Sequence, residues 1–423
     1  MLVWALVTDP GDVLKRKTYI LQPMWLIVGF ALFAPLLVRP LTRLLTWLPA
    51  RLPGATGLLA RQNASTSVRR TAAVAAPVLI TVALAVSLLG TVATVNGAKA
   101  TEAAAQTGAD WVVAADEGRT LDPLFLARAQ NIPGVVTSAS RSGAVTVLEG
   151  GTALIRSEAR AVDPAALAQV ARLPVVSGRI ADLDDDSIVV NQEWETRAVG
   201  QRVSVWLGDG RKTSLRIAAV LRVGTGSNGV YVTPKNAAGA AIDRIDIKLR
   251  TEANRSATAA LLEEAGRDTA TPVLTKDTWV SEHYPRTSEN TRMGMLLILG
   301  IALLYTGIAL ANTLVMATTD RVRDLAVLRL TGATKPQVLW LVTVEALVVV
   351  VVGAVLGGAV AALNLLGVKG ALELLSVSSP VLVPWGAVSA LLAASTALAT
   401  VSAVLPALAA LRTRPVELGG MRE

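Results

Sequence analysis

The stretch DRVRDLAVLRLTGATKPQVLWLVTVEALVVVVVGAVLGG, residues 320–358, begins with closely spaced charges and ends in unbroken hydrocarbon. Its first part predicts a short helix over 320–330, because oppositely charged side chains recur three residues apart. Gly332 then supplies the left-handed residue that ends such a helix. Thr334 starts the next helix as N-cap, with Gln337 as its capping-box partner. We therefore predict two helices joined by a defined bend; an ordinary basic loop is the alternative.

Long apolar runs surround this stretch. The chain is 52% hydrophobic and 17% charged, whereas a typical soluble domain has about 25% charged residues. Four runs contain neither Lys nor Arg and exceed the roughly 20 residues that a membrane span needs, namely 71–95, 293–317, 338–368 and 381–411. A fifth run, 18–38, is weaker because Gln22, Pro23 and Pro35 interrupt it. The sequence therefore predicts four strong spans and one weaker N-terminal span.

The excess positive charge lies in the hydrophobic parts of the chain. Residues 99–292 hold 23 Lys or Arg and 24 Asp or Glu, whereas the rest holds 17 and 8. A nucleic-acid-binding protein would concentrate basic residues on a polar domain, so we expect no nucleic-acid partner. Cytoplasmic loops of membrane proteins are rich in Lys and Arg. This rule places three basic segments inside the cell, at 39–70, 321–335 and 412–422.

The orientation of the spans divides the chain into four segments. Residues 1–50 contain the weaker span, and 51–97 a cytoplasmic segment followed by a transmembrane helix. Residues 98–292 form an extracytoplasmic α+β domain, and 293–423 form three transmembrane helices with the cytoplasmic helix 320–330 between them. The predicted fold class is thus an α-helical multi-pass membrane domain with an inserted α+β extracytoplasmic domain.

Within the outer segment, local patterns predict both strands and helices. Alternating or β-branched runs predict strands in SIVVNQEW, QRVSVWLGDGRKTSLRIAAVLRV and GVYVTP, with a hairpin turn at residues 208–210. A spacing of three and four residues between apolar positions predicts helices in DPAALAQVARL and RSATAALLEEAGRD. A core of mixed α/β type follows from these elements.

A glycine pattern in this segment matches the G-x-G-x-x-G fingerprint of dinucleotide-binding sites. Its glycines are Gly224, Gly226 and Gly229. In such sites the glycines lead into a helix whose N-terminus binds the pyrophosphate. Here VYVTP, a predicted strand, follows instead. We therefore predict a hairpin turn and no bound cofactor.

An acidic run in the outer segment has the spacing of a calcium-binding loop. Asp182, Asp184 and Asp186 alternate, and Glu193 occupies the twelfth position. The sixth position of such a loop requires glycine, but Ser187 stands there and a predicted strand follows. We interpret the run as an acidic turn and expect no metal site.

Nothing in the sequence predicts catalysis by this chain. There is no cysteine, His283 is the single histidine, and no G-x-S-x-G elbow or G-x-x-x-x-G-K-S/T phosphate loop is present. One carboxylate, Glu345, falls inside a predicted span, where charge is costly and suggests a functional or paired group. The alternative is that Glu345 lies near the membrane surface, close to a helix N-terminus that tolerates an anion.

Four parts of the chain resemble the FtsX/MacB-like ABC transporter permease family. The stretch at 320–358 resembles its charged helix, L-R-x-x-G-A-T turn and E-A-L start of a glycine-spaced span. LLARQNASTSVRRTAAVAAP resembles the elbow before its first span, and LPALAALRTRPVEL its C-terminal end. SGRIADLDDDSIVVNQEWETRAVGQRVSVWLGDG resembles its outer domain. The likeness covers roughly residues 58–418 in the same order. In these parts the chain resembles the C-terminal permease repeat of a two-repeat or split form of this family.

The resemblance implies a mechanism and its residues. The helix 320–330 would be the coupling helix that docks on a separate ABC-type ATPase, which binds the ATP. The implied coupling residues are Arg321, Arg323, Asp324, Leu325, Arg329, Gly332 and Thr334. A second permease unit, either a second copy or a paired half, would complete the transporter in the bacterial plasma membrane, among membrane lipids.

The implied function is export or extraction of a lipoprotein, lipid, peptide or drug, driven by ATP hydrolysis in the partner. One alternative is an FtsX-like protein that transmits a signal to an extracytoplasmic hydrolase or sensor without moving cargo. Another is a membrane-anchored receptor with no ATPase partner. An outer protein or cargo would bind residues 98–292 in each case.

Overall fold

A computed structural model describes residues 16–45, 68–115, 119–226, 228–250, 254–267, 269, 272–285, 289–319 and 327–411. These residues form two compact units. The sheet unit contains Val95–Arg286 and Ala371–Pro380. The helix unit contains the described parts of 12–94, 287–370 and 381–423. The predicted outer segment 98–292 corresponds to the first part of the sheet unit, to which residues 371–380 are added.

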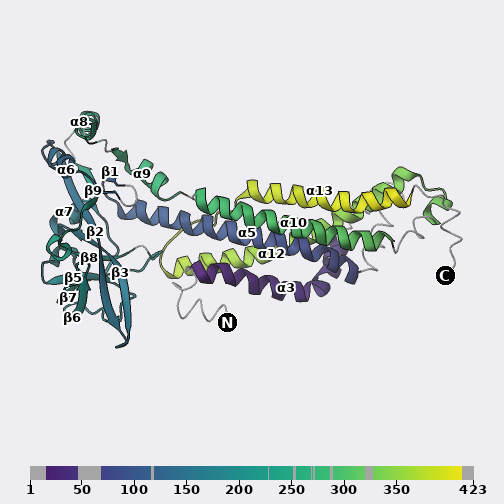
Figure 1. Ribbon diagram of the computed structural model, residues 1–423, viewed down its shortest axis with the longest axis horizontal. Helices are drawn as coiled ribbons and strands as arrows, with labels where there is room; N and C mark the ends of the chain where they lie inside the picture. The colour runs from purple at the N-terminus through teal and green to yellow at the C-terminus, as the bar shows by residue number, and fades with distance from the viewer. Residues whose placement is uncertain are drawn as a thin grey trace. The chain divides into compact units, whose positions relative to one another are not determined.

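Long helices make up the helix unit and lie alongside one another (Figure 1). They are α3 (Arg16–Leu45), α5 (Val68–Gln106), α10 (Glu289–Thr319), α12 (Lys335–Leu374) and α13 (Trp385–Ala410). In the described chain, four helices are long and apolar enough to cross a membrane, and they coincide with the four strong predicted spans. Those predictions are confirmed. The weaker predicted span at 18–38 lies within α3, where the apolar helix found among the described side chains is Met24–Phe33; this span stays a prediction.

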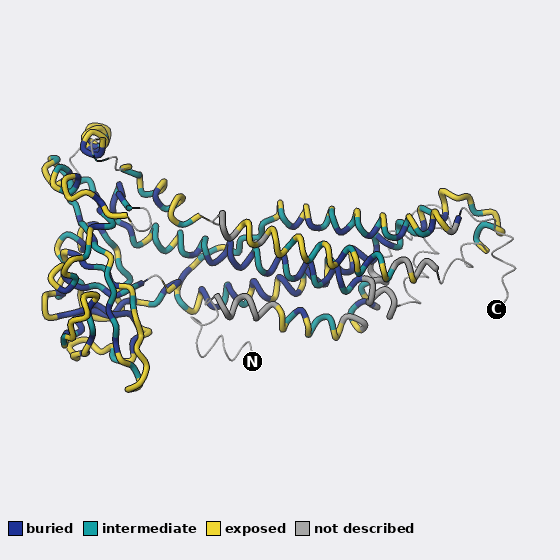
Figure 2. The backbone as a smooth tube through the Cα atoms, in the orientation of Figure 1, coloured by how far each residue is buried: buried dark blue, intermediate teal, exposed yellow. Residues whose placement is uncertain are grey.

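The outer surface of these helices is apolar. Few residues in the apolar part of helix α10 are buried, whereas most residues in the apolar part of α5 are buried (Figure 2). On α10, Ile301 is 70% exposed and Leu304 67% exposed. Water would disfavour such a surface, while lipid tails are as apolar as these side chains. The exposed face therefore fits a multi-pass membrane protein.

Small residues bring α12 close to α5. A Cβ atom at Gly353 would lie 2.8 Å from the Ala75 carbonyl oxygen, and one at Gly357 would lie 2.8 Å from the Leu79 carbonyl oxygen. Close approach of backbones through glycines four residues apart is a common way for membrane helices to associate. Buried polar contacts add to this packing: Asn364 of α12 donates to the Thr91 hydroxyl (3.1 Å).

A ten-stranded mixed sheet forms the sheet unit, with order β10-β1-β9-β2-β3-β8-β5-β7-β4 and β6 between β2 and β7. The strands are β1 (Trp111–Ala114), β2 (Val135–Glu149), β3 (Ala153–Val162), β4 (Val175–Gly178), β5 (Ser187–Asn191), β6 (Arg202–Leu207), β7 (Lys212–Leu221), β8 (Val230–Val232), β9 (Ile242–Leu249) and β10 (Leu274–Thr275). The helices are α6 (Pro123–Gln130), α7 (Pro164–Val170), α8 (Arg255–Arg267) and α9 (Lys276–His283), with short 3-10 turns η2 (Ile180–Asp182) and η3 (Pro234–Ala237).

Six strands of this sheet close into a ring. The pairings run β2-β3-β8-β5-β7-β6 and return to β2. Alternate residues of these strands point inward and form one buried cluster, which includes Val147, Ile188, Val205 and Ile217. Closure removes the unpaired strand edges that favour aggregation. A second buried cluster lies between the strands β1 and β9 and the helices α6 and α8 (Figure 1).

The predicted outer elements are found at β5, β6, β7, β8, α7 and α8, and the turn at residues 208–210 joins β6 to β7. The prediction of a hairpin at residues 224–229 is wrong. This loop joins β7 to β8, but β5 lies between those two strands in the sheet. Strand β5 pairs in parallel with β7 and antiparallel with β8. A pairing of this kind depends on the whole sheet and leaves no local signal.

Candidate functional site

The bend at the start of α12 has well-defined local geometry. Gly332 has φ +100°, so it takes the left-handed conformation that glycine adopts without strain. The Ala333 N–H donates to the Leu328 carbonyl (3.0 Å), and the Gly332 N–H donates to the Arg329 carbonyl (3.1 Å). These two bonds form a Schellman motif, which closes the end of the preceding helix. Residues 327–338 are called the coupling turn below.

The coupling turn continues directly into α12. The Thr334 N–H donates to the Gln337 side-chain oxygen (2.9 Å), which is the predicted capping-box bond. Leu328 and Ala333 pack against a small apolar cluster around Val338 and Leu411. Hydrogen bonds and packing thus set the angle between the two helices.

One guanidinium in the coupling turn lacks a full set of partners. The Nε of Arg329 is buried and makes no hydrogen bond within the described residues. An unsatisfied buried donor costs about 1–3 kcal/mol. Arg321, Arg323, Asp324 and Leu325, also predicted for coupling, lie outside the described residues.

A second polar site lies within the sheet unit, where the end of α5 meets the loop between β7 and β8. Residues 222–229, here called the glycine loop, surround the Glu102 carboxylate. Glu102 accepts hydrogen bonds from the Thr225 N–H (2.8 Å), the Thr225 hydroxyl and the Asn228 amide (3.0 Å). The Gln106 amide, one turn later on α5, donates to Glu102 (3.1 Å) and to the Asn228 side-chain oxygen (2.8 Å).

The glycine loop leaves no room for a side chain at Gly224. Gly224 has φ +60°, and a Cβ atom there would lie 1.8 Å from Glu102 Oε1. Asn228 is buried and also donates to the Arg222 carbonyl (2.7 Å), which holds the loop closed. The oxyanion bound by this G-x-G-x-x-G sequence is therefore a carboxylate of the same chain. Sequence reasoning missed Glu102, because it lies 123 residues from its partner Thr225.

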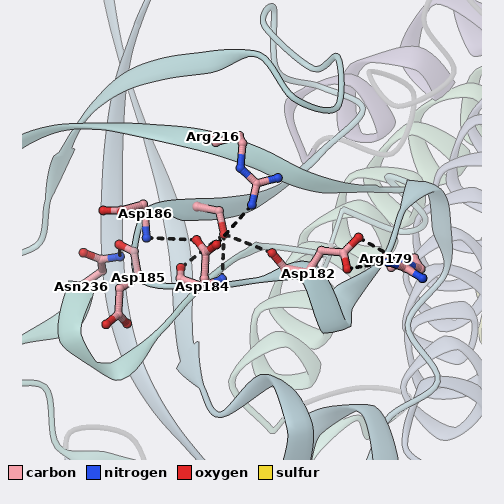
Figure 3. A network of polar contacts seen from close by, with 8 residues as sticks. Arg179, Asp182, Asp184, Asp185, Asp186, Arg216 and Asn236 are labelled. Atoms are coloured by element: carbon pink, nitrogen blue, oxygen red, sulfur yellow. Dashed lines mark hydrogen bonds and ion pairs between the residues drawn. The ribbon is translucent and has the colours of Figure 1, made fainter.

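The acidic run 182–186 forms an acidic turn whose carboxylates have separate partners (Figure 3). Arg179 donates two hydrogen bonds to Asp182 (3.1 and 2.9 Å), and Arg216 pairs with Asp184 (3.2 Å). The Thr233 hydroxyl donates to Asp185 (2.7 Å), and Lys235 pairs with the same carboxylate (3.4 Å). The side chains point apart, as in the acidic turn predicted from the sequence.

Acidification is expected to weaken the sheet unit through this acidic turn. The pKa values of Asp184 and Asp185 lie below the ordinary aspartate value, mainly because the Ser187 and Thr233 hydroxyls hydrogen-bond to them. The unfolded chain then binds more protons. The stability from these carboxylates is therefore complete above an ordinary pKa of about 3.9 and is lost as pH falls through the folded values. Thermal unfolding of the full chain over acidic pH measures the loss.

The Asp185→Asn variant should show a flatter decline of unfolding temperature with falling pH than the wild type. Glu263→Gln, on the exposed face of α8, is the matched control and should keep the wild-type profile. Identical profiles for all three proteins would contradict the role of the acidic turn.

Two further residues named in the sequence analysis, Glu345 and His283, lie in α12 and α9. Glu345 is partly buried in α12, and its role stays a prediction. His283 is exposed at the end of α9, where its Nδ1 lies 3.2 Å from the Trp279 carbonyl oxygen.

Comparison with known proteins supports the resemblance. Residues 296–415 match the family model described as FtsX-like permease C-terminal. None of the curated proteins matches the chain. Among solved structures, the periplasmic region of MacB from Actinobacillus actinomycetemcomitans aligns at 13% identity and a TM-score of 0.33, over 44% of this chain and 96% of that one. A domain assigned to a permease protein of Porphyromonas gingivalis aligns at 14% identity and a TM-score of 0.25, over 40% and 78%. This chain is thus a multi-pass membrane protein whose residues 296–415 are similar to the FtsX-like permease C-terminal family.

Proposed function

We propose that this chain is the permease subunit of an ABC transporter of the mechanotransmission type. A separate ATPase binds and hydrolyses ATP, and the permease converts the movement of that ATPase into movement of the sheet unit. The observation that carries the proposal is the hydrogen-bonded coupling turn, which lies inside the segment matched by the FtsX-like family model. The chain itself is not an enzyme in this proposal, and a second permease unit completes the assembly.

The helices supply a route for this movement. Helix α12 is continuous over 40 residues from the coupling turn, and an α-helix of that length extends about 60 Å. The glycines of α12 hold it against α5, which also ends in the sheet unit with Glu102. A push at the coupling turn therefore acts on helices that resist bending. Export or extraction of a lipoprotein, lipid, peptide or drug is the output we favour.

Charge reversal at Arg329 is expected to remove the ATPase. The side chain of Arg329 lies in the coupling turn with its Nε unpaired among the described residues, so Arg329→Glu replaces a donor with a repelling carboxylate. A tagged chain is purified from gently solubilised native membranes, and co-purifying ABC ATPases are quantified by mass spectrometry. We expect at least a tenfold loss, because removing one buried charged partner costs about 2–5 kcal/mol.

Arg156→Glu is the matched control, because Arg156 is exposed on β3 of the sheet unit. It should retain the ATPase at the wild-type level. Equal recovery with Arg329→Glu would refute the coupling turn as the docking site. If no ATPase is recovered with any of the three proteins, the receptor alternative becomes the better account.

A further inference from the structure

A polar cavity of about 110 Å³ lies within the sheet unit, beside the end of α5. Its walls come from α5, α7, α9 and the strands β2, β3, β8 and β9. Drug-sized ligands occupy pockets of roughly 300–1,000 Å³, whereas a single water needs only about 10–15 Å³. The cavity therefore has room for one small polar group or several waters, and not for a large cargo molecule.

Three cations line this cavity, and its acids are already engaged. Lys99, Arg160 and Arg244 face two carboxylates, Glu102 and Asp246. Glu102 is held by the glycine loop. Asp246 forms a buried pair with Arg244, with a shortest N–O distance of 2.7 Å. The two acids therefore have little capacity left for the other two cations.

The remaining cations are under-paired. No carboxylate among the described residues pairs with Lys99, which is the first charged residue after the apolar part of α5. Arg160 donates to the Ser140 hydroxyl (3.2 Å) and has only a long ion pair with Asp243 (3.7 Å). Among the cations of the cavity, Lys99 is therefore the one with no carboxylate partner in the described chain.

Trp279 is a neutral side chain in the wall of the cavity. Trp279 is buried, and its Nε1 makes no hydrogen bond in the part of the chain that the structure describes. The Arg244 guanidinium stacks 4.1 Å above the Trp279 ring and also donates to Thr107 (3.2 Å), so both groups are held rigidly. Buried donors usually have an acceptor. A ligand with oxygen acceptors in the cavity would supply one to Lys99.

We propose that this cavity binds a small oxyanion group, a carboxylate or a phosphate, through Lys99 and Arg160, beside the ring of Trp279. The group belongs to a free small molecule or to the headgroup of an anionic lipid. This binding is independent of the ATPase, so it can be tested without one.

Fluorine NMR of the full chain tests the proposal. The chain is labelled with 5-fluorotryptophan in phosphatidylcholine nanodiscs, and the Trp279 signal is assigned with Trp279→Phe. Titration with inorganic phosphate or acetate should shift that signal saturably.

The variant Lys99→Met should weaken binding about tenfold, which is the effect expected from losing one charge-assisted hydrogen bond. Lys99 has no ion-pair partner among the described residues to lose, so this variant should fold. Arg156→Met, exposed on the same strand as Arg160, removes a charge outside the cavity and should bind as the wild type does.

The lipid composition of the nanodiscs distinguishes a free anion from a lipid headgroup as the source of the oxyanion. A shift caused by added phosphate or acetate in phosphatidylcholine nanodiscs identifies a free anion. A Trp279 signal already shifted in phosphatidylglycerol nanodiscs, and unmoved by added anions, identifies a lipid headgroup. Absence of any shift with all three probes, or an equal shift in Lys99→Met, would overturn the proposal.

Discussion

Replacing Glu102 with alanine is expected to destabilise the sheet unit by about 3 kcal/mol, because buried donors of the glycine loop would lose a charged acceptor. Thr225 and Asn228 are both buried, so water replaces the carboxylate poorly. For a unit of this size the change corresponds to a fall of roughly 6–12 °C in unfolding temperature. Hydrogen exchange of residues 222–229 in the full chain should also accelerate.

Two further variants separate the hydrogen bonds from packing. Glu102→Gln keeps the shape but replaces one acceptor oxygen with a donor, so an intermediate loss is expected. Gly224→Ala forces a Cβ atom against the carboxylate at φ +60° and should destabilise as well. In the double variant with Glu102→Ala the clash with the carboxylate disappears, so its total loss should be smaller than the sum of the two single losses.

Glu263→Ala is the control for this series, since Glu263 is exposed on α8. It should leave both the unfolding temperature and the exchange of the glycine loop unchanged. Wild-type exchange at residues 222–229 in Glu102→Ala would show that the carboxylate does not hold the loop.

Replacing Gly357 with alanine is expected to separate α12 from α5. The new Cβ atom would lie 2.8 Å from the Leu79 carbonyl oxygen and 2.9 Å from Val82 Cβ. Backbone atoms cannot rotate away as a side-chain end can, so one helix must shift. Overpacking of this kind costs about 1–3 kcal/mol, and Gly353→Ala, with its clash one turn earlier, should act in the same way. Thermal unfolding in nanodiscs measures the effect.

The neighbouring glycine gives a matched control. A Cβ atom at Gly358 would meet no atom within 4 Å, and alanine favours a helix over glycine by about 1 kcal/mol. Gly358→Ala should therefore be neutral or slightly stabilising. If Gly357→Ala and Gly358→Ala unfold at the same temperature, the close packing of α5 and α12 does not contribute to stability.

The spans and the bend could be predicted from the sequence because each depends on nearby residues. In lipid a helix satisfies all of its own backbone groups, so an apolar run of sufficient length predicts a span by itself. The conformation of Gly332 and the Thr334–Gln337 bond likewise involve residues only a few positions apart. The same locality explains the correct strands β6 and β7 and the turn between them.

The glycine loop and the cavity required the tertiary structure. A G-x-G-x-x-G pattern indicates a loop that accepts an oxyanion, but which oxyanion depends on Glu102, which the fold brings from the end of α5. The cavity gathers Lys99, Arg160 and Trp279 from three elements spread over 180 residues. The sequence alone determined the membrane helices and the coupling turn, because solvent and backbone chemistry act locally. Only the tertiary structure decided which buried donors meet an acceptor, because that pairing depends on strand order and helix packing across the chain.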